Sequence, residues 1–247
     1  MVAVGGTAIE PYVERARPDV AGLALGVVLA PLFGLASLVR GERCVHPDGV
    51  AAEGVLVVAD PPSRVGYGSI LGVPGEHRAV VRLSRGLGYA PPRRDVHGLA
   101  IRLPDAGGPG RAQDLLLVTV TPKAGGRFKI VESAGFGPLL ATVLAQRVGT
   151  TLTRLTAVPV GGVADDAAVL AGATDGLAFR LAGHLDAQVS VPLAELRVGP
   201  SLEPATAEDL RFDPWNTGGG ISPAGVLGGA RRVVYPASQL GRRLRRA

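Results

Sequence analysis

The sequence predicts a predominantly β protein of the α+β class, with short strands, many turns and few helices. The chain has 247 residues, a length at which an all-β barrel often forms a single domain. Its 36 glycines and 20 prolines indicate turns and short elements in place of a helical bundle. Apolar residues make up 47% of the chain and aromatic residues only 4%, so Val, Leu, Ala and Ile must build the core.

The chain divides into two parts of different composition. Residues 1–41 are expected to form an N-terminal apolar helical segment, in which 20–39 runs for twenty residues without a charge. That length could span a bilayer, but three glycines and a proline interrupt it. We expect an apolar helix packed on the main domain or on a partner, with peripheral membrane contact through 20–39 as the alternative. Residues 42–247 are expected to form the main domain, with a helix at its C-terminus.

Alternation of apolar and polar residues, the pattern of half-buried strands, marks most of the main domain. The strands are expected at 55–59, 79–84, 95–103, 114–121, 178–182 and 187–192. Between 135 and 148, apolar residues recur at helical spacing and predict a helix. The polar residues 200–209 are expected to form a linker.

Charge and cysteine content limit the function classes. The net charge of +5 is concentrated in an arginine-rich C-terminus without interleaved aromatic residues. Nucleic-acid-binding proteins carry a broader basic surface, so we expect no nucleic-acid partner. The single cysteine, Cys44, excludes an internal disulfide and a multi-cysteine metal site. It fits a reducing compartment, and we expect a cytoplasmic protein.

The stretch 228–246 places one tyrosine, Tyr235, among arginines. Arg231 precedes it by four residues, so the two side chains share a face if the stretch is helical. The permanent charge of arginine favours the phenolate form of a nearby tyrosine, and a tyrosinate can be an axial ligand of ferric haem. Arg242, two helical turns after Tyr235, could meet an anionic group at the rim of that cofactor. The alternative is a basic helix whose tyrosine packs on a core.

Motifs near both ends of the chain resemble those of a known protein family. The sequence reads FDPWN at 212–216, GISP at 220–223 and RRVVYPAS at 231–238. This order resembles the haem-catalase pattern FDPxN, GIxP and RxxxYPDT, with alanine in place of the aspartate. Arg43 and His46 resemble the catalase segment RxxHxxG. A chance match to one end would not supply the other end in the correct order.

The resemblance implies a role for each matched residue. His46 would move a proton between the two oxygens of a peroxide, and Ser84 would orient its imidazole. Tyr235 would be the iron ligand, stabilised by Arg231. Three arginines would hold the haem propionates: Arg43, Arg82 and Arg242.

The segment 114–121 departs from the family. The family pattern DLVGNNTP supplies an asparagine as a second distal polar group, whereas this chain has Val118 and Thr119. Thr119 could donate one hydrogen bond instead, so it is kept as a candidate catalytic residue. His97 stands where the family has an arginine.

As a whole, the resemblance implies a minimal, truncated catalase-like protein, built as an antiparallel β-barrel with a few flanking helices. We expect a haem-dependent oxidoreductase that acts on hydrogen peroxide or organic hydroperoxides, more as a peroxidase than as a fast catalase. Its cofactor would be ferric b-type haem. Its partners would be a peroxide or lipid hydroperoxide and an organic reductant, with a homodimer as an open alternative for its assembly. Three other functions stay open: haem binding without strong catalysis, rearrangement of fatty-acid hydroperoxides, and a haem-free membrane-surface interaction module.

Overall fold

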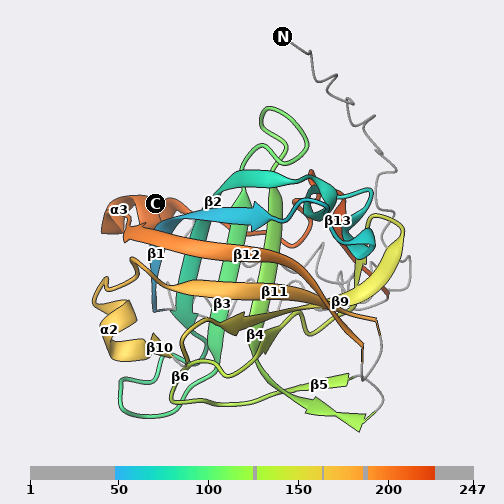
Figure 1. Cartoon of the computed structure of the whole chain (residues 1–247). Coiled ribbons are helices and arrows are strands. Elements are labelled where there is room, and N and C mark those ends of the chain that lie inside the picture. The colour runs from blue at the N-terminus through green and yellow to red at the C-terminus, as the bar shows by residue number, and fades with distance from the viewer. Residues whose placement is uncertain (1–47, 125–126, 163, 186–188, 226–247) are drawn as a thin grey trace, which may run out of the picture.

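The computed structural model describes residues 48–225, except 125–126, 163 and 186–188. The predicted apolar segment 1–41, the boundary that follows it and the stretch around Tyr235 lie outside these residues. Figure 1 shows the described part as a barrel of strands with short helices beside it. None of the helices in this part combines the length and the apolar character that crossing a bilayer requires.

Eight of the described strands close into an antiparallel barrel. Each strand pairs with the next one around the barrel, and β9 pairs back with β11. In that order they are β11 (Ala178–His184), β12 (Ser190–Ser201), β1 (Gly49–Val58), β2 (Gly75–Arg85), β3 (His97–Leu103), β4 (Gln113–Lys123), β7 (Leu140–Ala141) and β9 (Thr151–Pro159). Closure removes the free edges that an open sheet would have. The predicted antiparallel barrel is confirmed.

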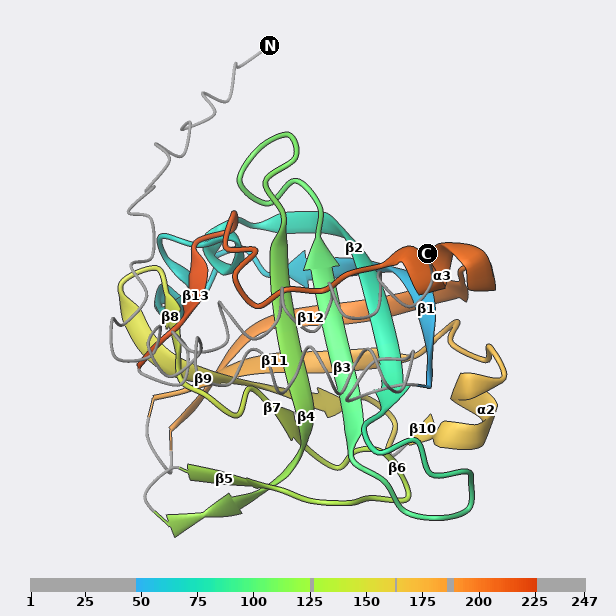
Figure 2. The ribbon, with the colours of Figure 1, turned by 180° about the vertical axis from the view of Figure 1, so that it is seen from behind.

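Shorter elements surround the barrel. β5 (Arg127–Ile130) pairs with the far end of β4. β8 (Gln146–Val148) pairs with β9 and with β13 (Ile221–Pro223), as Figure 2 shows. β6 (Gly135–Phe136) and β10 (Ala164–Asp165) form a separate pair. The described helices are η1 (Arg64–Gly66), η2 (Ile70–Gly72), α2 (Asp166–Leu170) and α3 (Pro204–Asp209), the last within the predicted linker.

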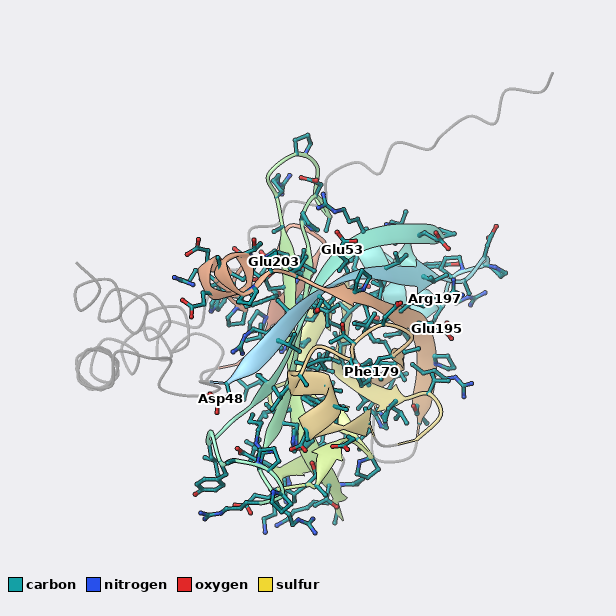
Figure 3. The ribbon with its side chains drawn as sticks, turned by 90° about the vertical axis from the view of Figure 1, so that its left-hand side faces the viewer. Asp48, Glu53, Phe179, Glu195, Arg197 and Glu203 are labelled. Atoms are coloured by element: carbon teal, nitrogen blue, oxygen red, sulfur yellow. The ribbon has the colours of Figure 1, made fainter. Side chains whose placement is uncertain are left out.

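Aliphatic side chains at alternating strand positions fill the barrel. The inward positions of three neighbouring strands are Val81 and Leu83, Leu99 and Ile101, and Leu115 and Leu117. Phe179 of β11, labelled in Figure 3, belongs to the same core and has no exposed surface. A strand residue between two inward-facing ones points to the opposite side of the sheet. Positions 82, 100 and 116 therefore point away from this core.

The helix predicted for 135–148 is wrong. The segment forms three short strands, β6, β7 and β8. Gly137 and Pro138 interrupt the helical pattern near its start, because glycine and proline have the lowest helix propensities. Leu140 and Ala141 instead pair with both β4 and β9, where they complete the barrel.

Candidate functional site

Two of the predicted site residues, Arg82 and Ser84, lie on one side of β2. The residue between them, Leu83, belongs to the core, so both point out of the barrel. Their exposed fractions are only 6% and 4%. The structure therefore brings these two residues together in a shielded position on the outside of the barrel.

We call the surface around them the outer face and define it by two rows of residues across β1–β4. In each row, strand pairing places the named residues beside one another on consecutive strands. The first row is Gly49, Ser84, Gly98 and Val118, and the second row is Ala51, Arg82, Ala100 and Leu116. Neighbouring strands are about 4.8 Å apart, so four strands make this face roughly 14 Å wide.

The residues beside Arg82 and Ser84 on the outer face are glycines and alanines, whose side chains extend little above the sheet. Where Gly49 begins β1, a Cβ atom would lie 2.7 Å from Ser84 Cβ and 2.8 Å from Arg82 Nη2. Non-bonded heavy atoms at their optimal separation are about 3.5–4.0 Å apart. The carbonyl oxygen of Leu83 would be nearer still, at 2.5 Å, so a larger residue would require the backbone of β2 as well as these side chains to shift. His46, the predicted proton-transfer residue, precedes Gly49 by three residues and lies outside the described part.

The hydroxyl of Ser84 donates a hydrogen bond to the carbonyl of Gly98 at 3.4 Å. A hydroxyl that donates one hydrogen bond still carries acceptor lone pairs. Ser84 can therefore accept a hydrogen bond from an imidazole N–H while it donates to Gly98.

Thr119 lies on the other side of β4 from the outer face. Its Oγ1 accepts a hydrogen bond from the backbone N–H of His97 at 3.1 Å and donates one to the carbonyl of Val131 at 2.7 Å. Its side chain is 1% exposed. The structure does not bring Thr119 together with Arg82 and Ser84, and Val118 is the β4 residue in the row of Ser84.

The sequence reasoning missed a polar cluster at one end of the barrel interior. We call it the inner cluster, and its members, all at most 7% exposed, are Arg85, Asp95, His97, Ser133 and Asp166. Asp166 accepts a hydrogen bond from Arg85 Nη1, and its Oδ2 lies 3.0 Å from His97 Nε2. His97 Nδ1 lies 2.9 Å from Ser133 Oγ, which donates to the carbonyl of Gly135 at 2.6 Å. The Ser–His–Asp order resembles a hydrolase triad. However, the Ser133 proton is directed at a backbone carbonyl, and the group is buried. The cluster therefore has a structural role, because it connects segments that are distant in the sequence.

Asp95 of the inner cluster accepts three backbone hydrogen bonds. They come from Leu87 at 2.8 Å, Tyr89 at 3.0 Å and Val96 at 2.6 Å, and Arg85 Nε lies 3.5 Å from the same carboxylate. Burial alone raises the pKa of Asp95. The three donors and the guanidinium together outweigh burial, and the pKa lies below its ordinary value.

The predicted FDPWN motif has a clear structural role. The carboxylate of Asp114 accepts hydrogen bonds from Arg102 at 2.8 and 2.6 Å, from Asp213 N at 2.7 Å and from Asn216 Nδ2 at 2.9 Å. The hydrogen bond with Asp114 is the main cause that raises the pKa of Arg102. Figure 2 shows the chain after α3 crossing in front of β3 and β4 before it reaches β13. Asp114 thus anchors the path that leads to 226–247.

The remaining predicted site residues lie outside the described part of the chain: Arg43, His46, Arg231, Tyr235 and Arg242. Between residues 48 and 225, apart from the gaps, no group of three or more His, Cys, Asp or Glu side chains is placed to hold a metal ion. A haem iron held by a single tyrosinate does not require such a group.

The geometry defines a closed antiparallel barrel with a candidate site on its outer surface. No protein-family model and no curated protein matches the sequence. The structure is similar to that of a fungal catalase, with a TM-score of 0.58, 14% identity and coverage of 81% of this chain and 59% of the catalase. A bacterial catalase gives a TM-score of 0.56, 13% identity and coverage of 81% and 57%. The chain has a catalase-like fold and spans less than two thirds of the length of these two catalases.

Proposed function

We propose that this chain is a haem-dependent oxidoreductase related to the catalases, which acts on hydrogen peroxide or organic hydroperoxides at the outer face. The observation that carries the proposal is the placement of Arg82 and Ser84 side by side, over glycine and alanine, on a catalase-like barrel. A flat apolar cofactor with carboxylates at its rim fits this surface. The small residues can accept a planar ring, and a guanidinium is well shaped to pair with a carboxylate.

Residues on both sides of the described part would hold the cofactor. Ferric b-type haem, when bound, supplies the iron-centred redox chemistry. Tyr235 would hold the iron as tyrosinate, because the charge of Arg231 favours the phenolate. The propionates would pair with Arg43, Arg82 and Arg242. Of these three arginines, Arg82 belongs to the outer face.

The proton transfer belongs to His46 and Ser84. If Ser84 accepts the N–H of one imidazole nitrogen, the other nitrogen is left unprotonated and faces the substrate. That nitrogen can take the proton from one peroxide oxygen and return it to the other oxygen as the bond between them breaks. The long contact of 3.4 Å from the Ser84 hydroxyl to the carbonyl of Gly98 is compatible with this role.

The test is a haem titration of the purified chain, followed by peroxide. Trp215 is the only tryptophan and lies in the segment that Asp114 anchors, so quenching of its emission reports haem binding beside the Soret band. We expect stoichiometric binding and turnover of a phenolic reductant after addition of peroxide. Tyr235→Phe should lose haem, whereas the control Tyr67→Phe, at an exposed tyrosine, should keep it.

Two outcomes would contradict the proposal. A Tyr235→Phe variant with a full Soret band would refute the iron-ligand assignment. A wild-type holoprotein that binds haem and turns over no peroxide would be a haem-binding protein without this catalysis.

A further inference from the structure

We propose that the folded chain holds one proton between His97 and Asp166, and that loss of this proton at alkaline pH releases a unit at one end of the barrel. The inference is independent of the proposed function, because the inner cluster and the outer face lie on opposite sides of the sheet. It follows from the protons that the hydrogen bonds of the inner cluster require.

Ser133 determines the state of one ring nitrogen of His97. A hydroxyl has a single proton, and that of Ser133 goes to the carbonyl of Gly135 at 2.6 Å. The Ser133 oxygen must therefore accept a hydrogen bond from His97 Nδ1, which lies 2.9 Å away. Nδ1 thus carries a proton, and in a neutral imidazole the other nitrogen, Nε2, would then have none.

Nε2 of His97 faces a carboxylate. Asp166 Oδ2 lies 3.0 Å from Nε2 and also accepts the Nη1 proton of Arg85. An ionised carboxylate can only accept hydrogen bonds, so a bare Nε2 would place two acceptors against each other. A proton between Nε2 and Oδ2 removes this conflict. It belongs on Nε2, because an imidazole is ordinarily a stronger base than a carboxylate.

The charge of the inner cluster requires the same proton. Apart from His97, its charged members are the guanidinium of Arg85 and the carboxylates of Asp95 and Asp166, all at most 7% exposed. Asp95 is ionised at neutral pH, because its hydrogen-bond donors and Arg85 hold its pKa below the ordinary value. With the proton on His97 the cluster is neutral, whereas without it one buried negative charge has no compensation, which is costly.

His97 contacts two further side chains within the described residues, and neither is charged. The ring of Phe136 lies 4.8 Å from the imidazole, centroid to centroid, in an edge arrangement. Thr119 Oγ1 accepts the backbone N–H of His97 at 3.1 Å. No other charge in the described part of the chain therefore contacts His97 to replace the proton.

The proton lies where a separate unit meets the barrel. β6 pairs with β10, and α2 follows β10 directly, so we call these three elements the end unit. Figures 1 and 2 both show them together at one end of the barrel. Phe136 of β6 and Asp166 of α2 both contact His97 of β3. Loss of the proton would leave the uncompensated charge between the end unit and the barrel.

The proton makes stability fall as the pH rises. Above about pH 6.5, an imidazole in the unfolded chain is neutral and an aspartate is ionised. The folded chain then binds one proton more than the unfolded chain, so the unfolding equilibrium constant increases about ten-fold with each pH unit. This dependence ends at the pH where the folded chain also loses the proton.

Nitrogen-15 NMR of the full chain, labelled at histidine, tests the proton directly. The chain has four histidines, and substitution of the other three assigns the signals of His97, so a folded His97 variant is not required. We expect both ring nitrogens of His97 to carry protons at about pH 7.5, where an ordinary histidine carries one.

Urea denaturation between about pH 7 and 9 tests the link to stability. His184→Gln is the matched control, because the ring of His184 lies 5.6 Å from that of Phe128, again in an edge arrangement. Burial lowers the pKa of His184, so above pH 7 it is neutral in both the folded and the unfolded chain. The unfolding constant should increase about ten-fold more per pH unit in the wild type and in His184→Gln than in His97→Gln.

Hydrogen exchange tests the release of the end unit. After correction for the intrinsic pH dependence of exchange, protection of β10 and α2 should fall at a lower pH than protection of β12. In His97→Gln, the end unit should exchange faster than in the wild type already at pH 7.

Three outcomes would overturn the inference. The first is a single proton on the His97 ring at about pH 7.5 in the folded wild type. The second is an equal pH dependence of stability in the wild type and a folded His97→Gln variant. The third is loss of protection at the same pH in the end unit and β12, which would mean that the whole barrel responds together. These measurements do not involve haem, so each of these outcomes would leave the proposed function standing.

Discussion

Asp166 is the residue on which the inner cluster depends. Its carboxylate contacts the side chains of Arg85 and His97, which are 1% and 0% exposed, so the contacts are shielded from bulk solvent. A buried ion pair adds little net stability, because desolvation offsets the attraction between the charges. Removing one partner is costly, because the other charge then remains buried without compensation. The cluster therefore fixes the position of α2 against β2 and β3.

We predict that Asp166→Asn lowers the free energy of unfolding by about 3 kcal/mol, measured by urea denaturation. The control Asp175→Asn changes an exposed carboxylate and should stay within about 0.5 kcal/mol of the wild type. A loss below about 1 kcal/mol in Asp166→Asn would show that water or a rearranged neighbour replaces the carboxylate charge.

Asp95 gives the chain an acid-sensitive contribution to stability. Its pKa is depressed in the folded state, so the contribution is complete above the unfolded value of about 4 and is lost as the pH falls through the folded-state pKa. The difference in unfolding free energy between wild type and Asp95→Asn should be constant above about pH 5 and should shrink below about pH 4. Urea denaturation from pH 3 to 7 measures it, and a constant difference down to pH 3 would contradict the assignment.

At the scale of elements, the start of β1 positions the outer face. Gly49 pairs with Ser84, and a Cβ added there would lie 2.5 Å from the carbonyl oxygen of Leu83 and 2.8 Å from Arg82 Nη2, so a larger residue requires these neighbours to shift. Gly199 of β12 differs, because the nearest atom to an added Cβ would be 3.7 Å away, an ordinary contact. These two strand glycines form a matched pair for testing the crowding.

We predict that Gly49→Ala lowers the unfolding free energy by about 1–3 kcal/mol through overpacking and weakens haem binding by displacing Arg82. Gly199→Ala should leave both quantities close to the wild-type values. Denaturation and the Trp215 quenching titration measure the two effects. Equal behaviour of the two variants would mean that β1 can shift at its start without disturbing the outer face.

The strands were predictable and the segment 135–148 was not. Alternation at 79–84 identified β2, and the two-residue spacing of Arg82 and Ser84 placed them on one face. A helical period also fits Leu139, Leu140, Val143 and Leu144. The Gly137–Pro138 break disfavours a helix, and a strand in this segment pairs with both β4 and β9 and so closes the barrel. A short apolar run cannot distinguish these cases by itself.

Part of the site could not be predicted without the three-dimensional structure. Val118 and Thr119 are adjacent, and only the pairing of Gly98 with Val118 decides which of them belongs to the outer face. Asp166 meets Arg85 and His97 across 81 and 69 residues of sequence, and no local pattern connects them. The FDPWN motif was visible in the sequence, whereas its partner Asp114 was not.

At the scale of the whole molecule, closure depends on strands from distant parts of the chain. Gly54 of β1 pairs with Val198 of β12, and the pairing continues along both strands. Such contacts must overcome a large loop-closure entropy before they contribute stability. We predict that ribosome-bound chains with residues up to 189 exposed are digested rapidly by protease. Chains exposed through 225 should resist digestion, and resistance of the shorter chains would show that the barrel forms without β12.

The late pairing of β1 has a consequence during synthesis. At about 5–20 residues per second, β1 would wait roughly 7–30 s for β12 to emerge from the ribosome, with β2 on one side and an unpaired edge on the other. An unpaired edge can template association with a neighbouring nascent chain. The extra residue in the irregular pairing of β1 with β12 belongs to β12, because the two steps from Ala52 to Gly54 face three steps from Ser201 to Val198. On β1 itself, the exposed Glu53, labelled in Figure 3, places a charge at this point. We expect the charge of Glu53 to hinder such association during translation, at an edge that the finished barrel no longer has.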